Sequence, residues 1–304
     1  MKPMTDSQKT PPPLRPAATV ILVRETRAGL QVYLLKRSAK SGFMGGKYVF
    51  PGGTLDAPDR DASFWRNQID VDSKAVDHRL GGDLTGDDIV AYGVAAIRET
   101  LEEAGVFLAH RNGHTLSDYE RIARLRLAAG LSKRWFLELV KTENWVLEFS
   151  QLYRWAQWIT PLRMKHRYDT RFFIVMMPDD QRCAPDTRET VHGLWVTPAE
   201  GLQGNLSAKI PLSPPTLVTL YQLMAYKDLN SLKADVSARQ WGKPLAPNMV
   251  ITPAGPLILE PWDPEWPCDT LTVDKDYLAH NILPPEEPMS RIWLHEGLWV
   301  PVKV

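Results

Sequence analysis

The chain has 304 residues, of which 44% are apolar and 24% are charged, a composition typical of a globular protein. Its 36 basic and 36 acidic residues balance, which gives no support to a nucleic-acid surface or a polybasic membrane anchor. Two cysteines occur, Cys183 and Cys268, without the Cys/His spacing of a zinc site. We therefore expect two free thiols in a reducing compartment.

The first sixteen residues, MKPMTDSQKTPPPLRP, are polar and proline-rich, and they lack the apolar stretch of a signal peptide. We expect residues 1–16 to form a disordered leader. No later run approaches the roughly 20 apolar residues that a membrane span needs. These features predict a cytoplasmic protein with no membrane contact and no nucleic-acid partner.

The first elements are predicted to be strands. Residues 17–24 (AATVILVR) and 31–37 (QVYLLKR) are apolar and β-branched, and they are expected to form a hairpin. The second of them alternates poorly, which favours burial on both faces. Residues 47–53 (KYVFPGG) are expected to form a short strand that ends in a Pro-Gly-Gly turn. Residues 57–88 are rich in Asp and predict an insertion, with one short helix around 61–69.

A long helix is expected next, with Asp87 or Asp88 as its N-cap and Gly105 just past its end. The periodicity of the remaining chain predicts helices over 115–143 with a break at Gly130, strands at 151–161 and 168–178, a strand leading into a short helix at 193–202, and a helix at 213–226. Residues 227–304 are expected to form short strands and turns in an extension packed on the main domain.

The long helix carries an unusual cluster of charge. Arg98, Glu99, Glu102 and Glu103 lie within six positions. Spacings of three and four place the glutamates on one helix face, where like charges repel. A solvated face paired with Arg or Lys is one explanation. A divalent-cation site is the other, because carboxylate oxygens at this spacing suit Mg²⁺ or Mn²⁺, which can bridge a pyrophosphate and activate water.

The turn before the helix favours the second explanation, because glycines at 52 and 53 let the backbone approach a ligand or metal closely. YVFPGG followed by AAIRETLEEAGV resembles the signature of the Nudix family, GX5EX7REUXEEXGU with U apolar, a loop-helix-loop that binds metal-diphosphate substrates. The matching positions are Gly53, Arg98, Glu99, Glu102, Glu103 and Gly105. The resemblance implies that the three glutamates bind the metals, that the carbonyl of Gly52 contributes, and that Arg98 orients the glutamates.

The motif departs from the family pattern in two ways. The insertion separates Gly53 from the helix, and the glutamate expected eight residues before Arg98 is Val90, with neither Asp87 nor Asp88 in register. Such a split motif, together with VYLLKRSAKSGFMGGKYVFPGG, resembles the Nudix branch that contains the mammalian peroxisomal coenzyme A diphosphatase. This resemblance covers about residues 17–226.

Other charged residues are candidates for the same site. Arg37 and Arg171 are expected to contact the phosphates of the substrate, with ordinary surface charge and a structural ion pair as the respective alternatives. Glu189 precedes the segment GLWV and is a candidate fourth metal ligand or general base, with Glu200 as its competitor. His192 has the chemistry of a base, but a lone histidine is more often structural.

Together these features predict an α/β protein with the Nudix fold, a mixed β-sheet in an α/β/α sandwich, with the Nudix domain at 17–226. The expected reaction is metal-dependent hydrolysis of the diphosphate in CoA or acyl-CoA, giving 3′,5′-ADP and 4′-phosphopantetheine. The alternatives are a Nudix hydrolase of ADP-ribose, NADH or a dinucleoside polyphosphate, and a non-enzymatic Nudix-fold binding module. The expected partners are a small nucleotide substrate and a second copy of the chain in a homodimer. The insertion, beside the catalytic helix, is expected to act as a lid.

Overall fold

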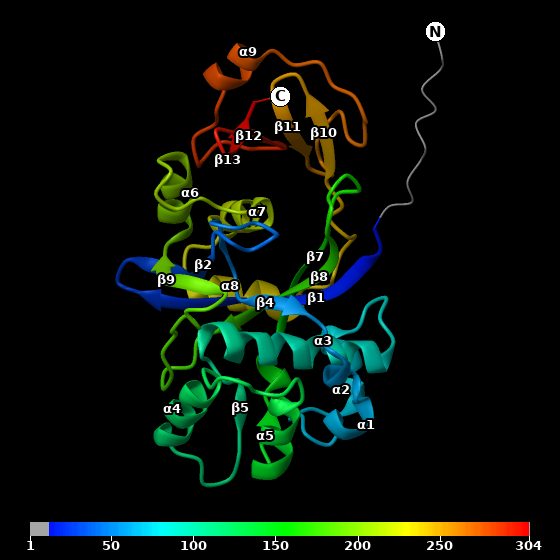
Figure 1. Ribbon diagram of the computed structural model, residues 1–304, viewed down its shortest axis with the longest axis vertical. Coiled ribbons are helices and arrows are strands. Elements are labelled where there is room, and N and C mark those ends of the chain that lie inside the picture. Colours follow the sequence, from blue (N-terminus) through cyan, green and yellow to red (C-terminus); the bar gives the residue numbers. More distant parts are fainter. Residues whose placement is uncertain (1–11, 304) are drawn as a thin grey trace.

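The computed structural model describes residues 12–303, and its centre is a seven-stranded mixed sheet (Figure 1). Strand β1 (Leu14–Thr26) pairs in parallel with β8 (Arg167–Met176) and antiparallel with β2 (Gly29–Arg37). The path β3-β2-β1-β8-β7 is extended by β4 on β1 and by β9 on β2. The bounds of the others are β3 (Tyr48–Val49), β4 (Gly52–Thr54), β7 (Tyr153–Ile159) and β9 (Thr190–Val196).

The predicted hairpin of the first two strands is confirmed, with Val23 opposite Val32. Both strands are buried on both faces. Val20 of β1 and Tyr33 of β2 pack in the cluster below the sheet, and Ile21 and Leu34 pack in the cluster above it. The start of the first strand corrects the expected leader, because Leu14 already pairs with Arg167. The rest of that leader, residues 1–11, lies outside the described residues.

Helices cover both faces of this sheet, which confirms the predicted α/β/α fold (Figure 1). One face carries α3 (Gly86–Glu99), with α4 (Leu116–Leu125) and α5 (Trp135–Glu143) beyond it. The other face carries α6 (Pro198–Leu206), α7 (Pro214–Leu223) and α8 (Leu229–Ala238). The smaller elements are η1 (Ala57–Arg60), α1 (Ala62–Trp65), α2 (Ser73–Leu80), η2 (Thr100–Ala104), β5 (Ala109–His110), β6 (Val146–Leu147), η3 (Phe149–Gln151) and α9 (Lys275–His280).

The insertion packs against α3 through fully buried Trp65 and adds α2, which the sequence did not predict. The expected helix at 61–69 is only the four-residue α1. The N-cap of α3 is Thr85, whose Oγ1 accepts a hydrogen bond from the backbone N–H of Asp88 at 3.3 Å. The two aspartates expected to cap the helix therefore lie in its first turn instead, where their charge still suits the positive helix end.

The C-terminal extension forms a four-stranded antiparallel sheet at the top of Figure 1. Its strands are β10 (Asn248–Thr252), β11 (Gly255–Leu259), β12 (Arg291–His295) and β13 (Leu298–Val302). Met249 and Ile258 join the apolar cluster above the central sheet, and the Asn205 side-chain amide donates to the carbonyl of Trp299 at 2.7 Å. The helices α8 and α9 both lie in the region expected to hold only strands and turns, which corrects that expectation. The division into a Nudix domain at 17–226 and an extension at 227–304 stays a prediction.

The two cysteines are free thiols, as predicted. None of the helices in residues 12–303 combines the length and apolar character that a membrane crossing requires.

Glu260, just after β11, is a fully buried carboxyl whose two oxygens have no hydrogen-bond partner in the described part of the chain. Burial raises its pKa to about 8. The folded chain therefore holds a proton here that the unfolded chain releases near the ordinary value of 4.5. Between these pH values the folded state binds more protons, so the free energy of unfolding falls as pH rises from about 4.5 to about 8.

Glu260→Gln should remove this pH dependence. We expect the variant to exceed the wild type in stability by roughly 4 kcal/mol at pH 8.5 and to match it near pH 5. Chemical denaturation at both pH values measures the difference. Glu286→Gln, an exposed change in the same extension, is the matched control. A pH profile of Glu260→Gln that parallels the wild type would contradict the prediction.

Candidate active site

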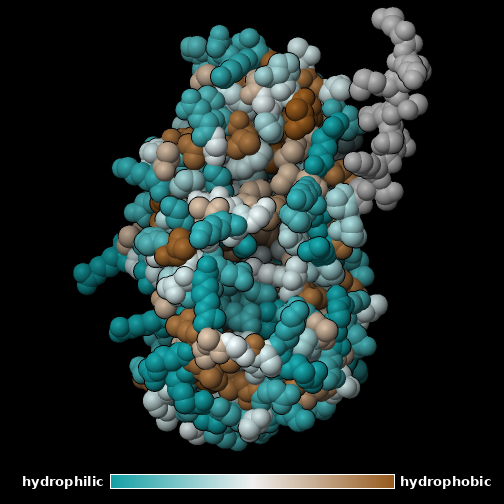
Figure 2. All heavy atoms as spheres, in the orientation of Figure 1, coloured by the Kyte–Doolittle hydropathy of each residue, from teal (hydrophilic) through white to brown (hydrophobic). Residues whose placement is uncertain are grey.

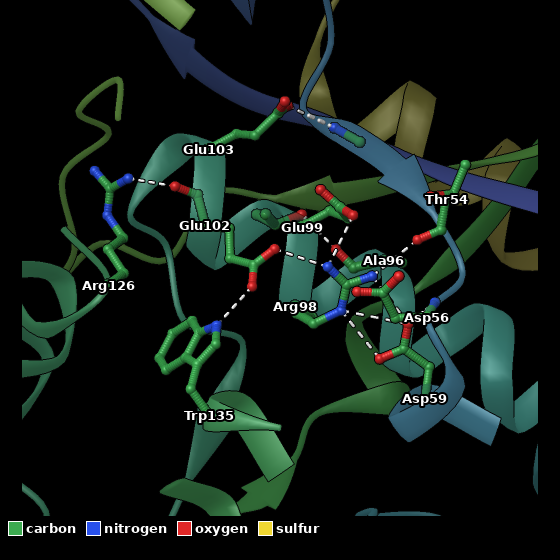
Figure 3. A network of polar contacts seen from close by, with 12 residues as sticks. Thr54, Asp56, Asp59, Ala96, Arg98, Glu99, Glu102, Glu103, Arg126 and Trp135 are labelled. Atoms are coloured by element: carbon green, nitrogen blue, oxygen red, sulfur yellow. Dashed lines mark hydrogen bonds and ion pairs between the residues drawn. The ribbon is translucent and has the colours of Figure 1, made fainter. Parts of the chain in front are cut away.

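The catalytic segment predicted from the sequence lies where α3 passes into the π-helical turn η2 (Thr100–Ala104). The turn ends at Gly105, which adopts the left-handed conformation with φ 74°. This confirms the predicted helix end. Wider turns of this kind occur often at functional sites because they redirect side chains. Here Glu99 and Glu102 both point to Arg98, whereas Glu103 turns toward β4 (Figure 3).

Arg98 is the centre of a buried polar network and is only 5% exposed. Its Nη1 lies 2.8 Å from Oε1 of Glu99 and 2.7 Å from Oε2 of Glu102. Its Nη2 donates to the carbonyl of Thr54 at 2.9 Å, which ties the helix to the end of β4. The planar guanidinium suits this task because its five N–H groups reach several acceptors at once.

Asp59, in η1, supplies the partner on the other side of Arg98. It is 1% exposed and accepts hydrogen bonds from Nε at 3.0 Å and Nη2 at 2.9 Å. Asp59 is not among the predicted site residues, because the family spacing measured from Arg98 leads to Val90 instead. Counting six positions forward from Gly53 reaches Asp59, so the insertion divides the motif after this acid. An aspartate therefore stands where the family signature has its first glutamate, so this position is moved to the other side of the insertion and does not fall at Val90.

The two glycines of β4 allow the strand to lie directly against the acids. The backbone N–H of Gly52 donates to Oε2 of Glu103 at 2.9 Å. A Cβ atom at Gly53 would collide with the carboxyl group of Glu99. The close approach expected from the Pro-Gly-Gly segment is therefore present, although Gly52 and Gly53 belong to a strand paired with β1 and not to a free turn.

The acids carry more negative charge than the neighbouring cations offset. Burial, with repulsion from Glu102, raises the pKa of Glu99 to about 7 although Arg98 opposes this change. Burial and the charge of Glu99 also raise the pKa of Glu103. Burial alone would lower the pKa of Arg98, but the surrounding carboxylates raise it overall. A bound divalent cation would supply the missing positive charge.

The donor chemistry fits a hard cation, because the cluster offers carboxylate oxygens and a neighbouring strand backbone. Within residues 12–303, no three Asp, Glu, His or Cys side chains converge as a ready metal site. The hydrogen bonds explain this arrangement, since Arg98 holds Glu99 and Glu102 while Gly52 holds Glu103. The assignment of metal ligands therefore stays a proposal.

The acids open into a cavity of about 660 Å³, a size typical of small-molecule sites. Figure 2 shows a hollow near the middle of this face of the molecule. Arg37 and Glu189 both line the cavity, as does Asp186 beside them. The charge of Glu189 raises the pKa of Glu103 and that of Arg37 lowers it. Among the described lining residues none belongs to 57–88, so the expected lid role of the insertion is not supported.

Comparison of the sequence with known protein families identifies the family of this chain. The family model described as the NUDT19 Nudix domain matches residues 14–223. The chain belongs to the Nudix family. It is accordingly a pyrophosphohydrolase, which acts on small nucleotide-linked compounds.

Several named relatives are similar to this Nudix chain. It is 28% identical to the human acyl-coenzyme A diphosphatase NUDT19 over 88% of this chain and 79% of that protein. It is 30% identical to the chicken protein of the same name over 66% of this chain and 63% of that protein. The crystal structure of a Nudix hydrolase from Alicyclobacillus acidocaldarius has a TM-score of 0.58 at 20% identity, covering 75% of this chain and 99% of that one, and this likeness supports the fold.

Arg171, a predicted site residue, does not line the cavity of the Nudix site. It is 1% exposed, pairs with Asp83 at 2.6 Å and lies 4.9 Å from the ring centre of Trp241. Its neighbours Thr170 and Phe172 line the cavity, and Arg171 does not. Successive strand residues face opposite sides, so Arg171 points to the other face of the sheet. This placement favours the structural ion pair over the expected substrate contact.

Glu200 and His192 also have structural partners. Glu200 accepts from the backbone N–H of Thr197 at 2.8 Å and closes the capping box at the start of α6. His192 places Nδ1 3.2 Å from the hydroxyl of Tyr48. Neither lines the cavity among the described residues, whereas Glu189 does, so Glu189 is better placed than Glu200 to act on a substrate.

Two further residues of the Nudix site were not predicted. Trp135 in α5 donates from Nε1 to Oε1 of Glu102 at 2.7 Å (Figure 3). Arg126 donates to the backbone carbonyl of Glu102 and, at 2.8 Å, to that of Ala184. Both are distant from the motif in sequence, and nothing in their local pattern indicates these contacts. Trp135 fixes the Glu102 carboxyl from the side opposite Arg98.

Proposed function

We propose that this protein hydrolyses the diphosphate linkage of CoA or acyl-CoA to 3′,5′-ADP and the corresponding 4′-phosphopantetheine. The observation that carries the proposal is a cavity large enough for a nucleotide conjugate that is lined by three glutamates, with Glu99 and Glu102 held by Arg98 and Glu103 held by the backbone of β4. The relatives named acyl-coenzyme A diphosphatase support the choice of substrate.

In the proposed mechanism, the three glutamates would hold Mg²⁺ or Mn²⁺, and the carbonyl of Gly52 would be a further ligand. The bound metal supplies charge neutralisation of the diphosphate and a more acidic water. Arg98 keeps the carboxylates of Glu99 and Glu102 in place, and Asp59 keeps Arg98 in place. These contacts preorganise the site, so little rearrangement is needed during the reaction.

Two lining residues complete the proposed machinery. Glu189 accepts the proton of the attacking water, since it lies in the cavity close enough to influence the pKa of Glu103. Arg37 binds the phosphates of the substrate from the same wall. Cytoplasmic location and homodimer formation stay predictions from the sequence.

Product analysis tests this function directly. The purified protein is incubated with Mg²⁺ or Mn²⁺ and with CoA, octanoyl-CoA, ADP-ribose, NADH or a dinucleoside tetraphosphate, and the products are identified by liquid chromatography and mass spectrometry. We expect 3′,5′-ADP from both CoA compounds and little turnover of the others. Preferential cleavage of another compound would keep the Nudix reaction and reject the CoA assignment.

A further inference from the structure

The C-terminal extension forms part of the cavity wall. Pro247, Met249 of β10 and Ile258 of β11 line the same cavity as the catalytic acids. Met249 is 6% exposed and Ile258 is 3% exposed, and both pack in one cluster with Trp158 and Phe172 of the central sheet. The cavity therefore has a wall built by two sheets, one of which lies outside the matched Nudix region.

The charged lining residues come from one part of the chain only, whereas apolar lining residues come from all of it. The charged lining residues all precede position 190: Arg37, Asp56, Arg98, Glu99, Glu102, Glu103, Arg126, Lys133, Asp186, Arg188 and Glu189. The described lining residues of the extension are only Pro247, Met249 and Ile258. Trp158 and Phe172 of the central sheet line the same cavity and belong to the same apolar cluster as Met249 and Ile258. The extension thus adds apolar surface and no charge to the site.

A CoA thioester has the same division of chemistry. Its nucleotide and diphosphate are highly charged, whereas its acyl chain is apolar. Only the acyl end gains free energy by leaving water for an apolar wall. We propose that Met249 and Ile258 of the C-terminal sheet form the acyl-binding end of the cavity and determine which acyl chain lengths are hydrolysed. This inference rests on the proposed CoA function.

Adenine stacking on Trp158 or Phe172 is the competing use of the apolar wall. The two uses differ in what they predict for substrate choice. Every CoA compound carries the same adenine, so damage to an adenine site lowers kcat/KM for all of them together. Damage to an acyl site changes the ratio between acyl-CoA and free CoA. The ratio is therefore the decisive quantity, and it is insensitive to the amount of folded enzyme.

Two opposite changes test the acyl site. Ile258→Trp fills it, and we expect kcat/KM for octanoyl-CoA to fall at least about tenfold relative to CoA. Met249→Ala enlarges it, and we expect the preference to move by several-fold toward palmitoyl-CoA over octanoyl-CoA. Ile251→Trp is the matched control, because Ile251 lies on the same strand as Met249 but is 59% exposed. The control should keep wild-type ratios.

Each outcome has a separate meaning. Opposite shifts in chain-length preference for the two variants support the acyl site. If both variants are active and keep the wild-type ratio of kcat/KM between acyl-CoA and CoA, the acyl site is overturned. An equal loss of kcat/KM on every CoA compound also overturns it and supports adenine stacking instead. Failure of the wild type to cleave any CoA compound overturns the proposed function itself and the acyl site with it. Because Met249→Ala adds no bulk, it keeps the test valid if Ile258→Trp does not fold.

Discussion

Replacing Glu103 by glutamine should lower kcat/KM for CoA by roughly 10³-fold while leaving the fold intact. Glutamine has nearly the same shape and can still accept the hydrogen bond from the Gly52 N–H. It cannot, however, supply the negative charge that a divalent cation needs. Steady-state kinetics with CoA at saturating Mg²⁺ measures the loss.

Stability separates this explanation from simple damage. Glu103 is 5% exposed and is repelled by the charge of Glu99, so removing its charge relieves a cost in the metal-free chain. We expect the unfolding midpoint of metal-free Glu103→Gln to equal or exceed that of the wild type. Glu120→Gln, a change in α4 at a side chain that is 71% exposed, should alter neither quantity. A variant that loses both activity and stability would contradict the assigned role.

Asp59→Asn should be the most destabilising single change near the site, by about 3–5 kcal/mol. Its carboxylate is fully buried against Arg98, and one oxygen also accepts from the backbone N–H of Asp56 at 2.8 Å. The amide of asparagine would turn a donor toward one of these donors. Arg98 would then shift toward Glu99 and Glu102, and misplacement of these carboxylates should cost at least about tenfold in kcat.

Chemical denaturation and kinetics on the same sample check this prediction. Asp87→Asn is the matched control, because Asp87 also pairs with an arginine, Arg66, at 2.8 Å, but its side chain is 75% exposed. That exposed pair should contribute less than about 1 kcal/mol. If both substitutions lower the free energy of unfolding equally, burial of the Asp59–Arg98 pair does not make it more important for stability than the exposed pair.

The part of the site that could be predicted is the part that is local in sequence. Arg98 and the three glutamates occupy one helix, so their spacing alone brings them together. The divergent direction of Glu103 could not be foreseen, because it depends on the π-helical turn and on a hydrogen bond from β4. Trp135 was missed for a related reason, since its contact with Glu102 depends on how α5 packs beneath α3.

Arg171 shows the limit of strand patterns. Alternation correctly implies that Arg171 and Phe172 face opposite sides of β8. It does not say which side meets the cavity, since both faces of the central sheet are covered. Asp59, in contrast, could have been predicted from the sequence, because it lies six positions after Gly53, where the family signature has its first acid. The extension was the least predictable part, since its helix α8 depends on packing of Leu232 and Val236 against the central sheet.

The insertion and the extension meet at Trp241, which donates from Nε1 to the carbonyl of Leu80 at 2.6 Å and packs beside Arg171. During synthesis on the ribosome, the catalytic helix and the insertion are made long before Trp241. The carbonyl of Leu80, at the end of α2, therefore gains its hydrogen-bond donor only when Trp241 has been translated. The contacts around the insertion can therefore be complete only after residue 241 has been synthesised, although the catalytic acids lie in the first half of the chain.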